Sequence, residues 1–80
     1  MDIEVVAYGI AREIIGDSSL TIEMEETATI KSLKDHLVTR FPEFSKLASL
    51  KFAVNEEYEE DSYEVQPHDE VVIIPPVSGG

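Results

Sequence analysis

Towards its C-terminal end the chain contains the stretch Glu70-Val71-Val72-Ile73-Ile74-Pro75-Pro76-Val77-Ser78-Gly79-Gly80. The run from Val71 to Ile74 puts β-branched side chains on both faces of an extended backbone, as in strands that are buried on both sides. The two prolines cannot continue such a strand. The stretch therefore predicts a last strand that is either central in a sheet or covered on its second face by a partner.

The segment after this strand, residues 75–80, is predicted to be a flexible tail that leaves the sheet in an extended conformation. A segment of this length reaches about 20 Å. Gly79 and Gly80 have no side chains, so the terminal carboxylate can pass along a narrow channel and be approached from either side. On the glycines alone, a frayed chain end without a role is the alternative.

The chemistry of a carboxylate gives a reason for a bare tail. A free carboxylate is a poor electrophile, but its mixed anhydride with AMP, made from ATP, can be attacked by a thiol or a persulfide. The chain contains no Cys, so it has no thiolate nucleophile, disulfide or Cys-ligated zinc of its own. A C-terminal thiocarboxylate is then the way in which this chain can hold sulfur.

Before the last strand, the sequence predicts a strand over Phe52-Ala53-Val54 and a reversal at Asn55-Glu56-Glu57 toward Tyr58. The acidic residues 59–64 are expected to form a solvated loop. Pro67-His68-Asp69 has the composition of another turn, so the last strand begins at Glu70.

The middle of the chain predicts an amphipathic helix. Thr29 is a suitable N-cap, and the apolar residues after it recur at helical spacing: Ile30, Leu33, Leu37 and Phe41. Pro42 lacks a backbone N–H and disfavours helical angles at the residue before it, so the helix should end there. Phe44, Leu47 and Leu50 are expected to form an irregular or short helical segment over the core.

The first part of the chain predicts a hairpin of two strands. Residues 3–8 alternate, with Ile3, Val5 and Ala7 on one face, and residues 20–24 alternate in the same way. Gly9 breaks the first strand, residues 11–15 can form one or two helical turns, and residues 16–19 read as a turn. The whole order predicts an α+β domain over residues 1–74, with one sheet and one main helix across one of its faces.

Three large apolar side chains have no obvious place in this core. Tyr8 lies on the parity opposite to the core of the first strand, Tyr58 follows the hairpin, and Ile74 ends the last strand. Together they predict an apolar patch of the kind that marks an interface. The alternative is that they are single exposed apolar residues, which are ordinary on protein surfaces.

Size and charge limit what the chain can do. A chain of 80 residues makes one small domain, in which no deep cleft is expected. Six Lys and Arg against 17 Asp and Glu give a formal net charge of 6 − 17 = −11. This charge argues against binding to nucleic acid or to an anionic membrane and favours a basic partner surface. The chain lacks an apolar run long enough to cross a bilayer and a basic start typical of signal peptides, so a cytoplasmic location is expected.

The sequence resembles the sulfur carriers of the ubiquitin-like β-grasp family, in particular the small subunits of molybdopterin synthase. The resemblance rests on Asp69-Glu70-Val71, on the ending Ile74-Pro75-Pro76-Val77-Ser78-Gly79-Gly80, on Phe52-Ala53-Val54-Asn55 and on Ala11-Arg12-Glu13. It covers essentially the whole chain. It implies a β-grasp fold with a mixed sheet and one main helix packed across one face.

The resemblance also implies roles for residues. An E1-like enzyme that uses ATP adenylates Gly80, and a sulfur donor protein converts it to a thiocarboxylate, with Gly79 as spacer. The tail then enters the large subunit of a heterotetrameric synthase, where cyclic pyranopterin monophosphate becomes molybdopterin. The chain itself is then not an enzyme and binds no cofactor or metal, and its partner contacts lie at Tyr8, Tyr58, Ile74, Pro75, Pro76, Val77 and Ser78.

Three alternatives stay open: a sulfur carrier for the thiazole of thiamine, a ubiquitin-like modifier joined through Gly80 to lysines, and an adaptor whose tail has no chemistry.

The two histidines, His36 and His68, have no Cys or paired carboxylates at metal-ligand spacing. The acidic run from Glu56 to Asp61 lacks calcium-loop spacing, and it predicts a soluble hairpin or a steering patch for a basic enzyme. Ser78 is interpreted as spacing, because no base can be placed near it.

Overall fold

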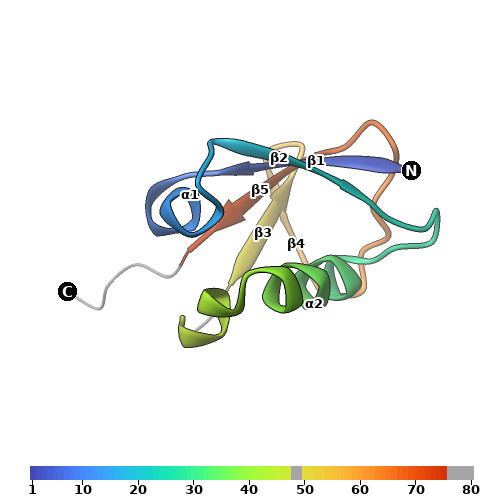
Figure 1. Cartoon of the computed structure of the whole chain (residues 1–80). Coiled ribbons are helices and arrows are strands. Elements are labelled where there is room, and N and C mark those ends of the chain that lie inside the picture. Colours follow the sequence, from blue (N-terminus) through green and yellow to red (C-terminus); the bar gives the residue numbers. More distant parts are fainter. Residues whose placement is uncertain (48–49, 76–80) are drawn as a thin grey trace.

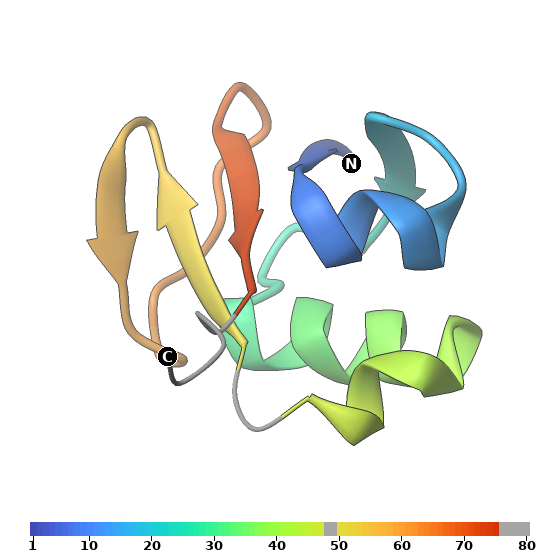
Figure 2. The ribbon, with the colours of Figure 1, turned by 90° about the vertical axis from the view of Figure 1, so that its left-hand side faces the viewer.

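The computed structural model describes residues 1–47 and 50–75. Along the chain the elements are β1 (Asp2–Ala7), α1 (Gly9–Ile15), β2 (Ser19–Glu23), α2 (Ile30–Arg40), the 3₁₀ helix η1 (Pro42–Lys46), β3 (Lys51–Val54), β4 (Glu57–Glu59) and β5 (Glu70–Ile74). The five strands form one sheet in the order β2-β1-β5-β3-β4. Figures 1 and 2 show α2 lying across one face of this sheet.

The sheet is mixed. β1 pairs with β2 and β3 with β4 and β5 in antiparallel fashion, whereas β1 and β5 are parallel neighbours. β5 is therefore central, which confirms one of the two readings of its β-branched run. The predicted antiparallel hairpin of the first two strands is also confirmed, and so is the α+β class with one main helix.

The helix α2 begins and ends where its sequence predicts. The Thr29 hydroxyl accepts the Ser32 N–H at 3.2 Å, and the Ser32 hydroxyl accepts the Thr29 N–H at 2.8 Å. These reciprocal bonds form a capping box, which satisfies two backbone donors at the helix start. At the other end Phe41 is the C-cap, and Pro42 opens η1 instead of continuing α2.

The core lies between the sheet and α2. On β1 the side chains of Ile3, Val5 and Ala7 are buried, as their parity predicts, and on α2 those of Leu33 and Leu37 are buried. η1 adds Phe44, which is 2% exposed, so the predicted helical segment over the core is confirmed at this residue. In the described part of the chain, no helix is long and apolar enough to cross a membrane.

Two expectations need correction. The first helix begins at Gly9 and not at Ala11. Residues 59–64 are not simply a solvated loop, because Glu59 ends β4 and Tyr63 packs against the core. The backbone of this segment docks on the start of α2, where the Ile30 N–H donates to the Tyr63 carbonyl at 3.0 Å. The acidic composition did not reveal this, because the contact is made by the main chain.

Candidate functional site

The face of the sheet opposite to α2 carries an apolar row that crosses four strands. Val6 on β1 is the neighbour of Val72 on β5, Val72 of Ala53 on β3, and Ala53 of Tyr58 on β4. Val6, Val72 and Ala53 are half-buried, and Tyr58 is 68% exposed. Since strand side chains alternate between faces, the buried positions Val5, Val71 and Val54 belong to the other face. The open face is thus apolar along its middle.

A second group of apolar side chains lies at the end of β1 and β5 from which the tail departs. Ala7 and Ile73 are parallel neighbours, and Tyr8 and Ile74 follow them. Tyr8 is 60% exposed and Ile10, the second residue of α1, is 42% exposed. Pro75 is half-buried, whereas Pro76, Val77, Ser78, Gly79 and Gly80 lie outside the described residues. The predicted exposure of Tyr8 and Tyr58 is confirmed, while their contact with a partner stays a prediction.

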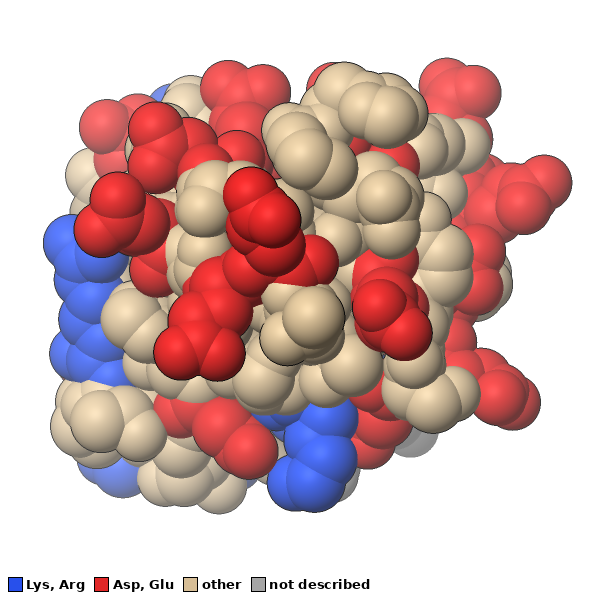
Figure 3. Space-filling model, turned by 90° about the vertical axis from the view of Figure 1, so that its right-hand side faces the viewer, with Lys and Arg blue, Asp and Glu red and all other residues tan. Residues whose placement is uncertain are grey.

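The opposite end of the sheet is acidic. Glu4 on β1 is the direct neighbour of Glu70 on β5, and both are exposed on the open face. Asp2 begins β1, Glu23 ends β2 and Glu57 begins β4 at this same end. Figure 3 looks at the end of the molecule away from Ile74, where red acidic side chains predominate. This distribution agrees with the predicted preference for a basic partner surface.

One buried carboxylate organises the loops at the acidic end. Asp69 is 6% exposed, and it accepts hydrogen bonds from the Asn55 amide, the Tyr63 hydroxyl and the Gln66 N–H, each at 2.8 Å. The Asn55 side-chain oxygen in turn accepts the Glu70 N–H at 3.0 Å. The network ties the β3–β4 turn to the start of β5, and it thereby fixes the position of β4 and Tyr58.

The network shifts two pKa values. Burial by itself raises the pKa of Asp69, but the three hydrogen bonds to its carboxylate outweigh burial and lower the pKa below its ordinary value. The hydrogen bond to Asp69, together with burial, raises the pKa of Tyr63 to about 12. Asp69 is therefore ionised and Tyr63 neutral at pH 7, so the charge in the network is fully hydrogen-bonded.

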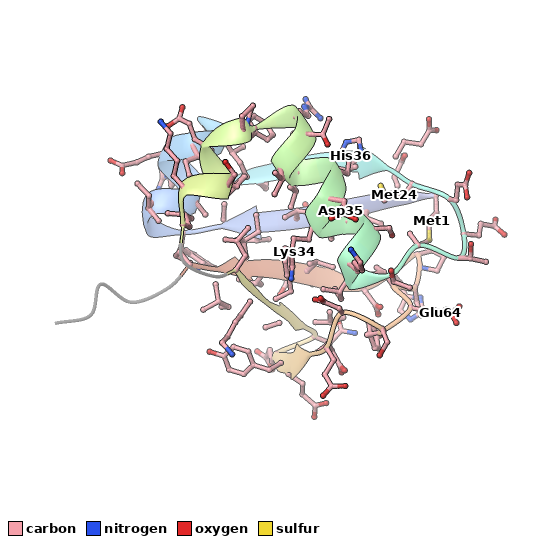
Figure 4. The ribbon with its side chains drawn as sticks, turned by 90° about the horizontal axis from the view of Figure 1, so that it is seen from below. Met1, Met24, Lys34, Asp35, His36 and Glu64 are labelled. Atoms are coloured by element: carbon pink, nitrogen blue, oxygen red, sulfur yellow. The ribbon has the colours of Figure 1, made fainter. Side chains whose placement is uncertain are left out.

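The two histidines lie apart. His68 is exposed, and His36 is half-buried on α2. Figure 4 shows His36 on the side of α2 that faces Met24, while Lys34 projects from the other side, where its ammonium lies 3.0 Å from the Asp61 carboxylate. In residues 1–47 and 50–75, no group of three or more His, Cys, Asp or Glu side chains could hold a metal ion.

Parity in the sequence identified Tyr8, Tyr58 and Ile74 but did not join them to Val72 and Ala53 in an apolar row. That row depends on which strands are neighbours, which the sequence does not state. Ile10 was missed because a short helix next to Gly9 gave no clear periodicity. Asp69 was interpreted as a turn residue and as part of the motif that carries the resemblance, although a carboxylate just before a buried strand is a signal that could have suggested a loop-ordering role.

Comparison with known proteins places this chain in a family. Residues 5–80 match the model of the ThiS family. A molybdopterin synthase sulfur carrier subunit of Arabidopsis thaliana is 42% identical over 81 residues, covering 100% of this chain and 84% of the relative.

Solved structures share the fold. A crystal structure of SAMP1 from Haloferax volcanii superimposes with a TM-score of 0.84 at 22% identity, with 100% of both chains covered. A chain in the complex of subunits 1 and 2 of the molybdopterin-converting factor from Helicobacter pylori gives a TM-score of 0.68 at 22% identity, again with 100% of both chains covered.

The mixed sheet in the order β2-β1-β5-β3-β4, with α2 across one face, defines a ubiquitin-like β-grasp fold. Within that class, the chain belongs to the ThiS family.

Proposed function

We propose that this chain is the sulfur carrier subunit of a molybdopterin synthase, and that Gly80 carries the sulfur as a thiocarboxylate. The observation that carries the proposal is the full-length similarity to relatives with this name, at 42% identity in the plant protein. The fold adds support, because β5 ends at Ile74, and the parallel pairing of Ala7 with Ile73 puts Ile74 at the same end of the sheet as the exposed side chain of Tyr8. The chain supplies the end group, and the enzymes that receive it supply the catalysis.

Sulfur loading proceeds in two steps in this proposal. The Gly80 carboxylate attacks the α-phosphorus of ATP on an E1-like enzyme, which releases pyrophosphate and forms an acyl-adenylate. A sulfur nucleophile of the donor protein then attacks the carbonyl carbon and expels AMP. When the nucleophile is a persulfide, a thiol cleaves the remaining S–S bond and leaves the thiocarboxylate. ATP is used by the activating enzyme, and the carrier binds no cofactor.

The partner in the second stage is the large synthase subunit, in a heterotetramer located in the cytoplasm. The tail from Pro75 through Pro76, Val77 and Ser78 enters the pocket of that subunit, with Gly79 as spacer. Two transfers from thiocarboxylates convert cyclic pyranopterin monophosphate into molybdopterin. The apolar row and Tyr8 form the contact surface, which suits an interface core with few charges.

The test is the intact mass of the protein after incubation with an E1-like enzyme, ATP and a sulfur donor. We expect a mass gain equal to the replacement of one oxygen by one sulfur, and no gain when Gly80 is deleted. The deletion removes a residue beyond β5, the last described element, so the circular dichroism spectrum of the variant should equal that of the parent. A deletion variant that still supports molybdopterin formation would refute the role of Gly80.

The molecule that receives the sulfur or the Gly80 acyl group distinguishes this proposal from the two alternatives that share its chemistry, the thiazole sulfur carrier and the ubiquitin-like modifier. The thiocarboxylated protein should form molybdopterin with the large synthase subunit and cyclic pyranopterin monophosphate. Sulfur transfer only to the enzyme that builds the thiazole of thiamine would replace the proposal, as would recovery of Gly80 only in isopeptide linkage to lysines.

A further inference from the structure

The strand β2 is an edge of the sheet, so it has a strand neighbour on one side only. The Met24 N–H donates to the Met1 carbonyl at 2.8 Å, and the Ala7 N–H donates to the Ser18 carbonyl at 2.9 Å. Because bonded and non-bonded pairs alternate in an antiparallel ladder, Ile22 and Leu20 bond to β1. The N–H and C=O groups of Ser19, Thr21 and Glu23 therefore point outward. No backbone hydrogen bond from the described residues reaches them.

The other edge offers much less. β4 has only three residues, and Glu57 pairs with Val54 across the two-residue turn Asn55-Glu56. Tyr58 is then the one residue of β4 whose backbone groups point outward. An incoming strand finds three outward-facing residues on β2 and one on β4, so β2 is the edge suited to strand addition.

The side chains around the outer half of β2 are strongly acidic. Residues 13–30 contain Glu13, Asp17, Glu23, Glu25 and Glu26 and neither Lys nor Arg. On β1, Glu4 is the neighbour of Thr21, and Asp2 is the neighbour of Glu23. All four of these side chains are exposed on the open face. Adjacent like charges disfavour each other, and cationic side chains of a ligand would relieve that repulsion.

The core side of the same edge is apolar. Leu20 and Met24 are half-buried, with part of each side chain reaching the surface. Beyond Glu23 the edge continues into a groove of about 330 Å³ lined by Met24, Glu25, Thr27, Ala28, Thr29 and Ser32. The two faces of an added strand would thus meet different surroundings, with acidic side chains on one side and the apolar side chains of Leu20 and Met24 on the other.

We propose that β2 binds an extended segment of a partner protein as an added strand, and that this segment alternates basic and apolar residues. Its basic side chains lie over Glu4 and Glu23, and its apolar side chains lie against Leu20 and Met24. The period of two follows from the alternation of side chains along a strand. Backbone bonds supply affinity, and the charges select the ligand. This function goes beyond sulfur carriage, because it uses neither the tail nor Tyr58.

The probe is a capped heptapeptide of alternating lysine and valine, added to the full-length ¹⁵N-labelled protein. We expect the largest amide shifts from Ser19 to Glu23, together with slower hydrogen exchange at the Thr21 and Glu23 amides. Thr21→Pro removes an outward N–H and no bond to β1, so the fold persists while peptide affinity falls by about tenfold or more. Thr21→Val keeps the N–H and should bind the peptide like the parent protein.

A second test varies the charge of the peptide. A heptapeptide of alternating glutamate and valine should not bind, and added salt should weaken the lysine peptide. The proposal is overturned by shifts that concentrate on β4 or on the apolar row, by equal binding to the Thr21→Pro variant, or by absence of binding. Sulfur loading of Gly80 in the Thr21→Pro variant should match that of the parent protein. Peptide binding therefore tests the strand-addition inference alone, and sulfur loading tests the sulfur-carrier proposal alone.

Discussion

At the scale of single residues, Asp69 is the side chain on which the loops depend most. It is the one charged side chain among the buried residues of the described chain, and its carboxylate accepts three hydrogen bonds. A buried charge with this many partners is stable in place, whereas its removal leaves the partner donors without acceptors. The Asp69 carboxylate thereby links the turn at Asn55 to the half-buried Tyr63.

Replacement of Asp69 by alanine tests how much this carboxylate contributes to stability. We expect Asp69→Ala to lower the free energy of unfolding by about 3 kcal/mol, because the Asn55 amide and the Tyr63 hydroxyl lose a charged acceptor. Urea denaturation at pH 7 measures the loss. Asp35→Ala is the matched control, since its ion pair with Lys31 is exposed, and it should change stability by less than about 0.5 kcal/mol.

Acid supplies an independent check on the same residue. The folded pKa of Asp69 is lowered, so its ionisation stabilises the fold above the unfolded pKa of about 4. That stabilisation is lost as pH falls from about 4 through the lower folded value. The gap in stability between the parent and Asp69→Ala should therefore narrow below pH 4. A constant gap from pH 7 to pH 2 would contradict the charge-based explanation.

At the scale of elements, the β3–β4 hairpin carries local strain. Asn55 has φ 51° and Glu56 has φ 73°, as in the two-residue turns that suit the twist of a hairpin. Asn tolerates the left-handed region, but Glu does so at a cost of roughly 1 kcal/mol. The network around Asp69 helps to hold this turn, since the Asn55 amide is one of its donors.

Glycine at the second turn position should relieve the strain. We expect Glu56→Gly to raise the free energy of unfolding by about 0.5–1 kcal/mol, because glycine adopts positive φ without a Cβ clash. Thermal or urea unfolding measures the change. Glu57→Gly, one residue later in β4, is the control, and it should destabilise because glycine weakens a strand. The explanation fails if both variants shift stability in the same direction.

At the scale of the whole molecule, the apolar and the acidic side chains lie on different parts of the surface. Tyr8 and Ile74 lie at one end of the sheet, and the acidic residues Glu4 and Glu70 lie at the other. The apolar row runs between these ends, from Val6 to Tyr58. A partner can therefore meet the apolar row while its basic side chains approach the acidic end.

The apolar row predicts the effect of a partner-face mutation. We expect Tyr58→Ala to weaken binding of the large synthase subunit by about tenfold or more, because a few large aromatic side chains often supply most of the affinity of an interface. Isothermal titration calorimetry measures the change. Thr39→Ala, an exposed position on α2, is the control that should bind normally. Unchanged affinity for Tyr58→Ala would remove this face from the proposed interface.

The sequence alone determined the features that depend on near neighbours along the chain. Alternation in residues 3–8 placed Ile3, Val5 and Ala7 in the core, and Thr29 and Pro42 marked the ends of α2, because parity, capping and the missing proline N–H are local effects. These features, with the number of strands around one helix, were enough for the fold class. They also singled out Tyr8 and Tyr58 as side chains outside the core.

Only the tertiary structure decided which distant residues became neighbours. The parallel pairing of β1 with β5 brings Val6 beside Val72 and Glu4 beside Glu70, and it leaves β2 at an edge. The burial of Asp69 among Asn55, Tyr63 and Gln66 arose in the same way. Strand order and register follow from packing the whole core at once, and no local pattern in a single sequence contains that information.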